Sequence, residues 1–111
     1  FQDFSLIKLT KVNQNVRHSY HIFPIQINFS EINISKSEIF NRLKDKGINL
    51  QVHYIPVHLQ PYYMKNFGFR KGDYPVAEAF YESEVTLPLY PDLKEDDVRK
   101  IVSILKEEIL K

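Results

Sequence analysis

The chain has 111 residues, of which 43% are hydrophobic and 14% aromatic; this is the composition of one ordered globular domain, and the length is short for a two-substrate enzyme. Its formal net charge is +1, so it lacks the clustered positive charge of a surface that binds nucleic acid or an anionic membrane. The sequence contains no cysteine, which excludes disulfides and thiol catalysis, and no apolar run approaches the roughly 20 residues of a membrane span, so we expect a cytoplasmic protein.

Two strands are expected in the N-terminal part. The first ten residues, FQDFSLIKLT, have the pattern of ordered, half-buried structure although the chain starts at Phe1 rather than Met, so we expect a piece of a longer protein. A polar turn at residues 13–15 precedes a second strand at residues 19–29, where apolar positions alternate (Tyr20, Ile22, Ile25, Ile27 and Phe29). Because Pro24 cannot donate a ladder hydrogen bond, its part of the strand is expected at an edge, a bulge or the margin of the sheet.

The clearest helix start is at Ser35. Ser35 and Glu38 fit the capping-box pattern, and apolar residues then follow at helical spacing up to Leu43. Gly47 is well placed to end this helix. The next segment, INLQVHYIPV at residues 48–57, is expected to be another strand that ends near Pro56.

Helices and one strand fill the C-terminal half. Residues 58–68 predict a short helix or turn with Gly68 as its stop, residues 75–84 predict a short helix, and residues 84–91 predict a strand bounded by Pro91. Residues 95–111 carry an apolar stripe at helical spacing, with acidic residues at the N-terminal end (Val98, Ile101, Val102, Leu105 and Ile109 form the stripe). This order predicts an α+β domain, a two-layer sandwich in which helices cover one face of a mainly antiparallel three- or four-stranded sheet.

Several kinds of chemistry are disfavoured by the residues themselves. His18 and His21 are three apart on an expected strand and project to opposite faces, and His53 with His58 lacks the third ligand of a zinc site. No nucleophile-elbow motif and no glycine-rich phosphate loop is present, since the chain has only three glycines. The glycine-and-aromatic signature of an RNA-binding sheet is also missing.

The stretch VHYIPVHLQPYY, residues 52–63, is richest in candidate binding groups. Pro56 could turn His53 and His58 toward one pocket, and uncharged hydrogen-bonding groups beside rings suit a sugar or nucleotide ligand. The alternative is that the tyrosines are residues at the margin of the core, with buried rings and hydrated hydroxyls. The residues alone leave both readings open.

Four segments in order resemble a known family: SYHIFPIQI, a capped helix ending in KDKGI, NLQVHYIPVHLQPYY, and GDYPVAEAFYESEVTLPLYPDLKEDDVRKIVSIL. Together they resemble the C-terminal small domain of the DegT/DnrJ/StrS-type sugar aminotransferases, which use pyridoxal phosphate (PLP) and have the aspartate-aminotransferase fold. The closest similarity is to enzymes that aminate nucleotide-linked 4-keto-6-deoxyhexoses. The resemblance implies a nucleotide-sugar substrate, an amino-acid donor and a homodimeric parent enzyme.

The resemblance also implies a division of labour. In this family the large N-terminal domain supplies the lysine that binds PLP, the Asp that pairs with the pyridine nitrogen and the main phosphate contacts, and the corresponding motif is not found here. The chain, residues 1–111, would thus be the small domain alone, without catalytic or cofactor-binding residues. His53, Tyr54 and His58 would lie nearest the substrate as hydrogen-bonding and shape contacts. Tyr62, Tyr63 and His21 are weaker candidates.

One position departs from the family pattern. The family usually has Thr or Ser as the cap of the last helix, where this chain has Lys94. Asp92 is expected to provide the cap instead. A different class of function also fits the residues, namely a stand-alone sugar-nucleotide-binding or regulatory domain without catalysis.

Overall fold

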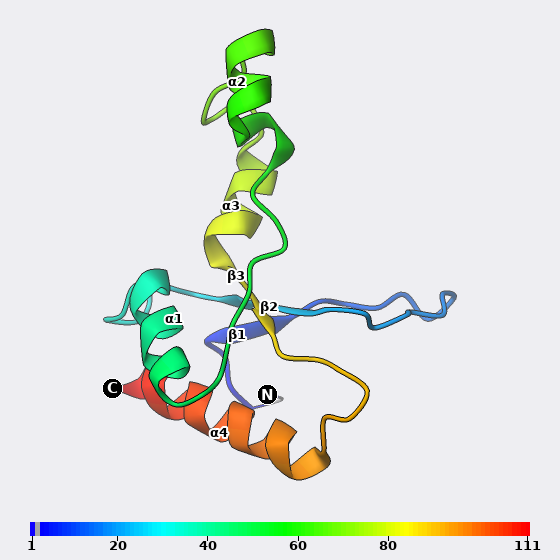
Figure 1. Cartoon of the computed structure of the whole chain (residues 1–111), viewed down its shortest axis with the longest axis vertical. Helices are drawn as coiled ribbons and strands as arrows, with labels where there is room; N and C mark the ends of the chain where they lie inside the picture. Colours follow the sequence, from blue (N-terminus) through cyan, green and yellow to red (C-terminus); the bar gives the residue numbers. More distant parts are fainter. Residues whose placement is uncertain (2) are drawn as a thin grey trace.

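A three-stranded antiparallel sheet lies at the centre of the part of the chain that the computed structural model describes, residue 1 and residues 3–111 (Figure 1). Gln2, within the N-terminal segment expected to be ordered, lies outside the described residues. The strands run in the order β1-β2-β3, and α1 and α4 pack on each other on one side of them (β1, Ile7–Leu9; β2, Phe23–Ile27; β3, Glu84–Leu87; α1, Lys36–Asp45; α4, Glu95–Leu110). The predicted α+β class and the antiparallel sheet backed by helices are confirmed.

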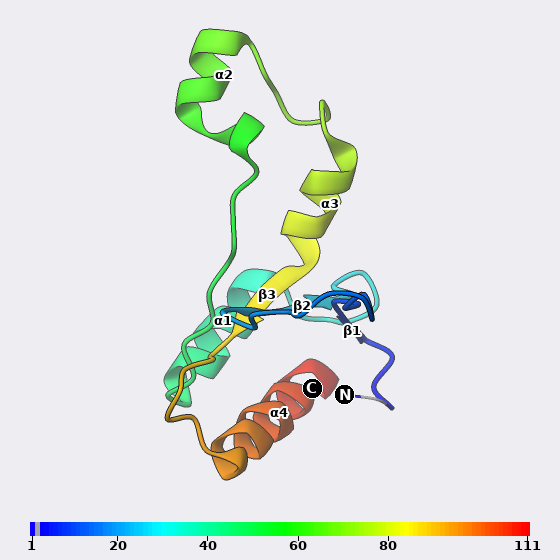
Figure 2. The same ribbon diagram turned by 90° about the vertical axis from the view of Figure 1, so that its right-hand side faces the viewer.

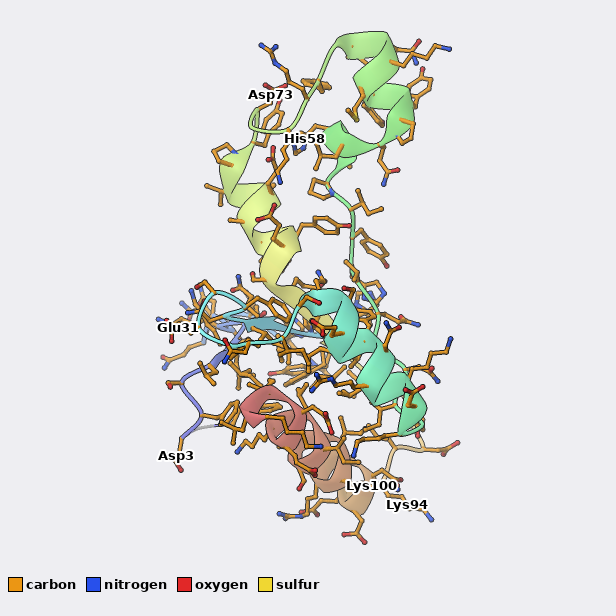
Figure 3. All side chains as sticks on the ribbon, turned by 90° about the vertical axis from the view of Figure 1, so that its left-hand side faces the viewer. Asp3, Glu31, His58, Asp73, Lys94 and Lys100 are labelled. Carbon is orange, nitrogen blue, oxygen red and sulfur yellow. The ribbon has the colours of Figure 1, made fainter. Side chains whose placement is uncertain are left out.

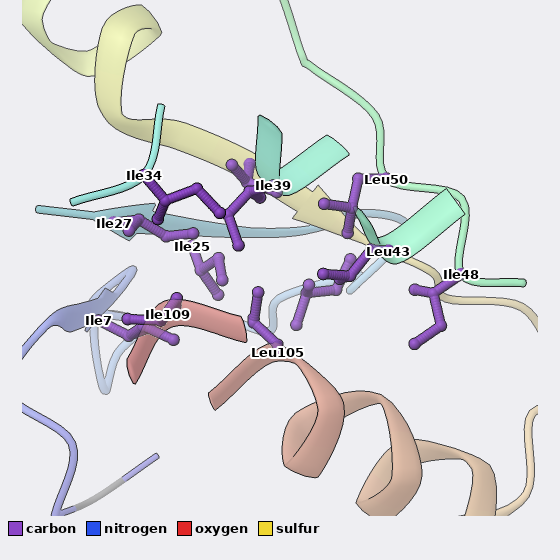
Figure 4. Packing of buried hydrophobic residues seen from close by; sticks show 12 residues of the cluster. Ile7, Ile25, Ile27, Ile34, Ile39, Leu43, Ile48, Leu50, Leu105 and Ile109 are labelled. Carbon is purple, nitrogen blue, oxygen red and sulfur yellow. The ribbon is translucent and has the colours of Figure 1, made fainter. Parts of the chain in front are cut away.

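The hydrophobic core lies between β2 and these two helices (Figure 4). Ile25 and Ile27 are two residues apart on β2, so they share one face of the sheet, and both are almost completely buried. They pack with the buried face of α1 and with Leu105 and Ile109 of α4. The apolar alternation of the strand and the helical stripe near the C-terminus therefore meet in one core.

Helix α1 begins and ends as its sequence signals predict. The Ser35 hydroxyl accepts from the Glu38 backbone N–H (3.3 Å), and the Glu38 carboxylate accepts from the Ser35 backbone N–H (2.9 Å). At the other end Gly47 has a φ of 77°, and its N–H donates to the Lys44 carbonyl oxygen (2.9 Å) while that of Ile48 donates to the Leu43 carbonyl oxygen (2.8 Å). This pair of bonds is a Schellman motif, whose central residue must adopt a left-handed conformation.

Replacing Gly47 by alanine is expected to lower the free energy of unfolding by about 1–2 kcal/mol, the cost of a left-handed residue with a side chain. A Cβ at this position would meet no atom within 4 Å, so the loss comes from the backbone alone. Urea unfolding followed by circular dichroism measures it. Lys44→Ala, at an exposed position of the same helix, is the control and should change stability by no more than about 0.5 kcal/mol. Equal effects of the two variants would contradict this explanation of the helix end.

The prediction of a strand at residues 48–57 is wrong. Only Gln51 pairs with the sheet, through reciprocal backbone bonds with Thr86 (3.1 and 2.8 Å). Two residues later the His53 backbone N–H donates to a side-chain oxygen of Glu84 (3.2 Å) rather than to a strand carbonyl. The ladder therefore stops, and the chain leaves the sheet before Pro56.

Two of the other three expected strands, at residues 19–29 and 84–91, are shorter than predicted. The pairing of β2 with β1 begins at Ile25, so Pro24 lies at the margin of the sheet, where it pairs only with Thr86 of β3. This agrees with the position expected for a proline, whereas residues 19–22 lie outside the ladder. At the same end of the sheet β3 stops at Leu87, opposite Phe23, because Pro88 has no N–H to donate.

An arm projects from the sheet on the side away from α4 (Figures 1 and 2). We define the arm as residues 54–83; it contains a short 3-10 helix and two α-helices (η1, Val57–Leu59; α2, Pro61–Phe67; α3, Pro75–Ser83). Helix α3 lies where the sequence predicts it, and the segment at residues 58–68, predicted as a short helix or turn, forms α2 and part of η1. Because of the arm, the radius of gyration is 15.7 Å, compared with about 13 Å for a compact domain of this length.

Helix α4 begins without the cap expected from Asp92. In the described part of the chain no side chain makes a capping hydrogen bond at Lys94, the residue that precedes the helix. The three acidic residues of the first turn (Glu95, Asp96 and Asp97) instead place negative charge at the positive end of the helix dipole. None of the helices in the described residues is long and apolar enough to cross a membrane.

Candidate functional site

His53 is held at the edge of β3 by two contacts. Its ring Nδ1 lies 2.9 Å from the Thr86 hydroxyl, and its backbone N–H donates to Oε2 of Glu84 (3.2 Å). The Thr86 hydroxyl in turn donates to Oε1 of Glu84, which is completely buried. The side chains of His53, Thr86 and Glu84 therefore form one hydrogen-bonded group.

A cavity of about 220 Å³ opens beside this group. Its lining combines His53 and Thr86 with residues from the end of β3 and from the segment before β2 (His21, Ile22, Asn49, Gln51, Leu87, Pro88, Leu89 and Tyr90 complete it). Typical ligand sites occupy about 300–1,000 Å³, so this cavity is large enough for part of a nucleotide sugar but not for the whole. His21, a weaker candidate from the sequence, thus lines the same cavity as His53.

Tyr54 lies next to His53 but faces solvent. Its side chain is 70% exposed, and its ring meets that of His53 edge to face, with centroids 4.5 Å apart. The peptide bond between the two residues is cis. Tyr54 is free to contact a ligand or another part of a larger protein, yet it does not line the cavity as the described residues define it.

His58 belongs to a different group of side chains, within the arm (Figure 3). It is buried, and its Nε2 lies 2.7 Å from Oε1 of Glu78 on α3. The Glu78 carboxylate also accepts the backbone N–H groups of Gly72 (2.9 Å) and Tyr74 (3.3 Å). The hydrogen bond from His58 lowers the pKa of Glu78, burial opposes this, and the two backbone hydrogen bonds lower it further.

The structure therefore does not bring His53 and His58 to one cavity. Tyr62 and Tyr63, the weaker candidates on α2, are exposed. They form an aromatic cluster with Phe67 of the same helix, in which Tyr63 stacks on Phe67 and Tyr62 meets Tyr63 edge to face. His58, Tyr62 and Tyr63 organise the arm, whereas His53 and His21 shape the cavity.

Sequence reasoning missed Glu84, Thr86 and Tyr90, which complete the surroundings of His53. A signal for the first two was available, because in EVTL the polar residues 84 and 86 alternate with apolar residues 85 and 87. In a strand, this places both polar side chains on the face opposite the core. Nothing in the sequence indicated that His53, more than thirty residues earlier, packs on that face.

The described residues place neither a lysine at the cavity nor a cluster of metal ligands anywhere among them. As far as they define it, the cavity beside His53 is lined by no lysine, and they contain no group of three or more His, Cys, Asp or Glu that could hold a metal ion. Lys36 is the lysine with a lowered pKa; burial lowers it, while attraction to Glu84 and Glu82 opposes the shift. Its ammonium donates to the Tyr81 carbonyl oxygen (2.6 Å), away from the cavity lining.

Comparison with known proteins identifies relatives along nearly the whole chain. A protein of Methanocaldococcus jannaschii, MJ1066, is 37% identical over 107 residues, which cover 96% of this chain and 28% of that protein. The spore coat polysaccharide biosynthesis protein SpsC of Bacillus subtilis is 36% identical over 97 residues, covering 86% and 25% of the two chains. This chain thus spans about a quarter of the length of these relatives.

Solved structures give the same result. Spr1654 from Streptococcus pneumoniae, described as a candidate sugar aminotransferase, matches in its apo form with a TM-score of 0.81 and 33% identity, covering 96% of this chain and 27% of its own. The PLP form of the same protein matches with a TM-score of 0.79 and 32% identity, covering 96% and 28%. The sequence pattern of the DegT/DnrJ/EryC1/StrS aminotransferases matches residues 1–106, so the resemblance noted from the sequence is confirmed and the chain belongs to this family.

Proposed function

We propose that residues 1–111 are the C-terminal small domain of a PLP-dependent aminotransferase that transfers an amino group to a nucleotide-linked keto-deoxysugar. The observation that carries this proposal is the family match over residues 1–106 in a chain that spans about a quarter of its relatives. The name of SpsC supports a role in polysaccharide biosynthesis. In this proposal the enzyme is cytoplasmic and homodimeric, takes its nitrogen from an amino acid, and binds PLP through a large domain outside this chain.

The large accessible surface area supports the proposal that another part of a larger protein packs on this chain. The accessible area is 8353 Å², whereas a compact monomer of 13.2 kDa exposes about 6,400 Å². The excess of roughly 2,000 Å² is more than one side of a standard interface, about 800 Å². Large apolar side chains are exposed along the arm (among them Tyr54, Val57, Tyr62, Phe67 and Val76), and we propose that the arm packs on the remainder of the parent enzyme.

The proposed role of each site residue follows from its exposure and from the hydrogen bonds that it already makes. His53 offers a ring nitrogen to the cavity, and the exposed Tyr54 offers a hydroxyl, so both are proposed to contact the nucleotide sugar directly. His58 contributes shape rather than a hydrogen bond, because its Nε2 is engaged by Glu78. None of the three is proposed to transfer a proton.

A stand-alone sugar-nucleotide-binding domain is the second candidate function. It is favoured by one observation, namely that this chain alone forms a cavity with polar groups beside His53. Under this hypothesis the chain binds a nucleotide sugar tightly without chemistry. Under the first hypothesis the cavity is one part of a larger site and binds little by itself.

The chain alone is expected to form no specific adduct with PLP after borohydride reduction. Peptide mass spectrometry should find scattered modification well below one adduct per chain, because the described residues place no lysine at the cavity. Lys36→Arg is the sharpest comparison, since a lowered pKa favours a lysine as nucleophile. A stoichiometric adduct at one lysine, removed by changing that residue, would overturn the proposal.

A titration with dTDP-glucose and with UDP-N-acetylglucosamine, followed by amide NMR shifts, separates the two candidates. The absence of amide shift changes on addition of either nucleotide sugar favours the small-domain proposal. Tight binding with shifts confined to residues around His53, and lost in His53→Ala, favours the stand-alone domain.

A further inference from the structure

Glu84 is a completely buried carboxylate for which the proposed function has no use. It stands at the start of β3, on the strand face that His53 covers. Its Oε2 accepts the His53 backbone N–H (3.2 Å), and its Oε1 accepts the Thr86 hydroxyl. A buried carboxylate with one donor on each oxygen has a defined orientation.

The hydroxyl of Thr86 links this carboxylate to the ring of His53. A hydroxyl has one hydrogen to donate, and an ionised carboxylate can only accept, so with Glu84 ionised that hydrogen belongs to the bond with Glu84. The remaining contact, from the Thr86 hydroxyl oxygen to Nδ1 of His53 at 2.9 Å, must then have the ring nitrogen as donor. A neutral imidazole carries one N–H, so with the proton on Nδ1 the other nitrogen, Nε2, is an acceptor.

The backbone holds this arrangement in place. Gln51 and Thr86 exchange two backbone hydrogen bonds (3.1 and 2.8 Å), two residues before His53. The ring therefore cannot slide along β3 without breaking the bridge. His53 and Thr86 both line the cavity, and within the described residues Nε2 makes no hydrogen bond.

We propose that Glu84 and Thr86 are positioning residues that hold His53 as the Nδ1–H tautomer and present its Nε2 lone pair to the cavity. At this point the site then accepts a hydrogen bond from a ligand hydroxyl and disfavours a phosphate or carbonyl oxygen. The choice of a sugar hydroxyl rests on the proposed function, whereas the tautomer does not. His58 provides an opposite case, because its Nε2 faces the Glu78 carboxylate and must carry the proton there.

The test is a two-bond ¹H–¹⁵N NMR correlation of the histidine rings in the 111-residue chain, recorded well above the ordinary histidine pKa of about 6.5. His53 is expected to show the Nδ1–H pattern and His58 the Nε2–H pattern in the same spectrum. Signals are assigned by their loss in His53→Asn and His58→Asn. A wild-type spectrum in which His53 is the Nε2–H tautomer would overturn the proposal without any variant.

Two substitutions of Thr86 then test the link. Thr86→Val keeps the shape but removes the hydroxyl, and the Nδ1–H tautomer of His53 should be lost or reduced to a minor form. Thr86→Ser restores a hydroxyl and should restore the tautomer, and unchanged His58 signals show that the fold is retained. If His53 keeps its Nδ1–H pattern in a folded Thr86→Val chain, Thr86 does not set the tautomer.

These outcomes are independent of ligand binding. A chain that shows the predicted tautomer but forms a stoichiometric PLP adduct refutes the proposed function alone. A chain with the opposite tautomer and no adduct refutes only the positioning role of Glu84 and Thr86.

Discussion

Leu105→Ala is expected to lower the free energy of unfolding by about 2–5 kcal/mol. Leu105 lies on the inner face of α4 and is completely buried in the cluster that joins both helices to β2. Truncation removes apolar contacts and leaves a cavity that the surrounding side chains fill only in part. Since domains are typically stable by about 5–15 kcal/mol, a large part of the chain's stability would be lost.

The matched control for this variant is Leu110→Ala. Leu110 ends the same helix and is 69% exposed, so the same chemical change removes little buried surface. Its effect in urea unfolding, followed by circular dichroism, should stay within about 0.5 kcal/mol. A loss at Leu105 no larger than that at Leu110 would mean that α4 does not close the core.

Glu78→Gln is expected to open the arm while the core stays folded. The Gly72 N–H lies 2.9 Å from both carboxylate oxygens. Glutamine keeps one acceptor oxygen without the negative charge, and its NH₂ group places a second donor beside the Gly72 N–H. Hydrogen exchange at the Gly72 and Tyr74 amides, which donate to Glu78, should become about tenfold faster, the scale of losing one charge-assisted bond. Exchange at Ile25 and Val85, in the sheet, should be unchanged.

Glu82→Gln is the control on the same helix, because Glu82 is exposed and its pair with Lys71 (2.8 Å) contributes little. A pH series gives a second check. The pKa of Glu78 lies below its ordinary value of 4.5, so its contribution is complete above that value and is lost as pH falls through the lowered pKa. The changes that acid causes in the chemical shifts of the Gly72 and Tyr74 amides should therefore become smaller in Glu78→Gln. If they keep their full size, another carboxyl group controls the loop, and Asp73, which lies between the two amides and accepts the Arg70 backbone N–H (2.9 Å), is the neighbouring one.

The predictions that succeeded rest on local signals. The capping box at Ser35 and Glu38 and the helix stop at Gly47 involve residues within five positions of one another. The apolar stripe of α4 depends only on helical periodicity. Such features depend on local contacts and not on the tertiary environment, so they can be predicted before any tertiary contact is known.

The prediction for residues 48–57 failed because strand formation depends on a partner. The segment has strand-forming residues, yet β3 offers it one backbone pair, at Thr86, and the next donor meets the Glu84 side chain. The arrangement of β2, β3 and α3 decides which edge of the sheet can pair with another strand, and over how many residues. No pattern within ten residues contains that information.

The sequence by itself determined the family, the α+β class and the positions of α1, α3 and α4, since these are carried by ordered motifs and short-range periodicity. Only the tertiary structure decided that His53 faces a cavity whereas His58 is buried in the arm. The reason is distance along the chain: His53 meets Thr86 across 33 residues, and His58 meets Glu78 across 20. The chemistry of each histidine is set by a partner that its neighbours in sequence do not reveal.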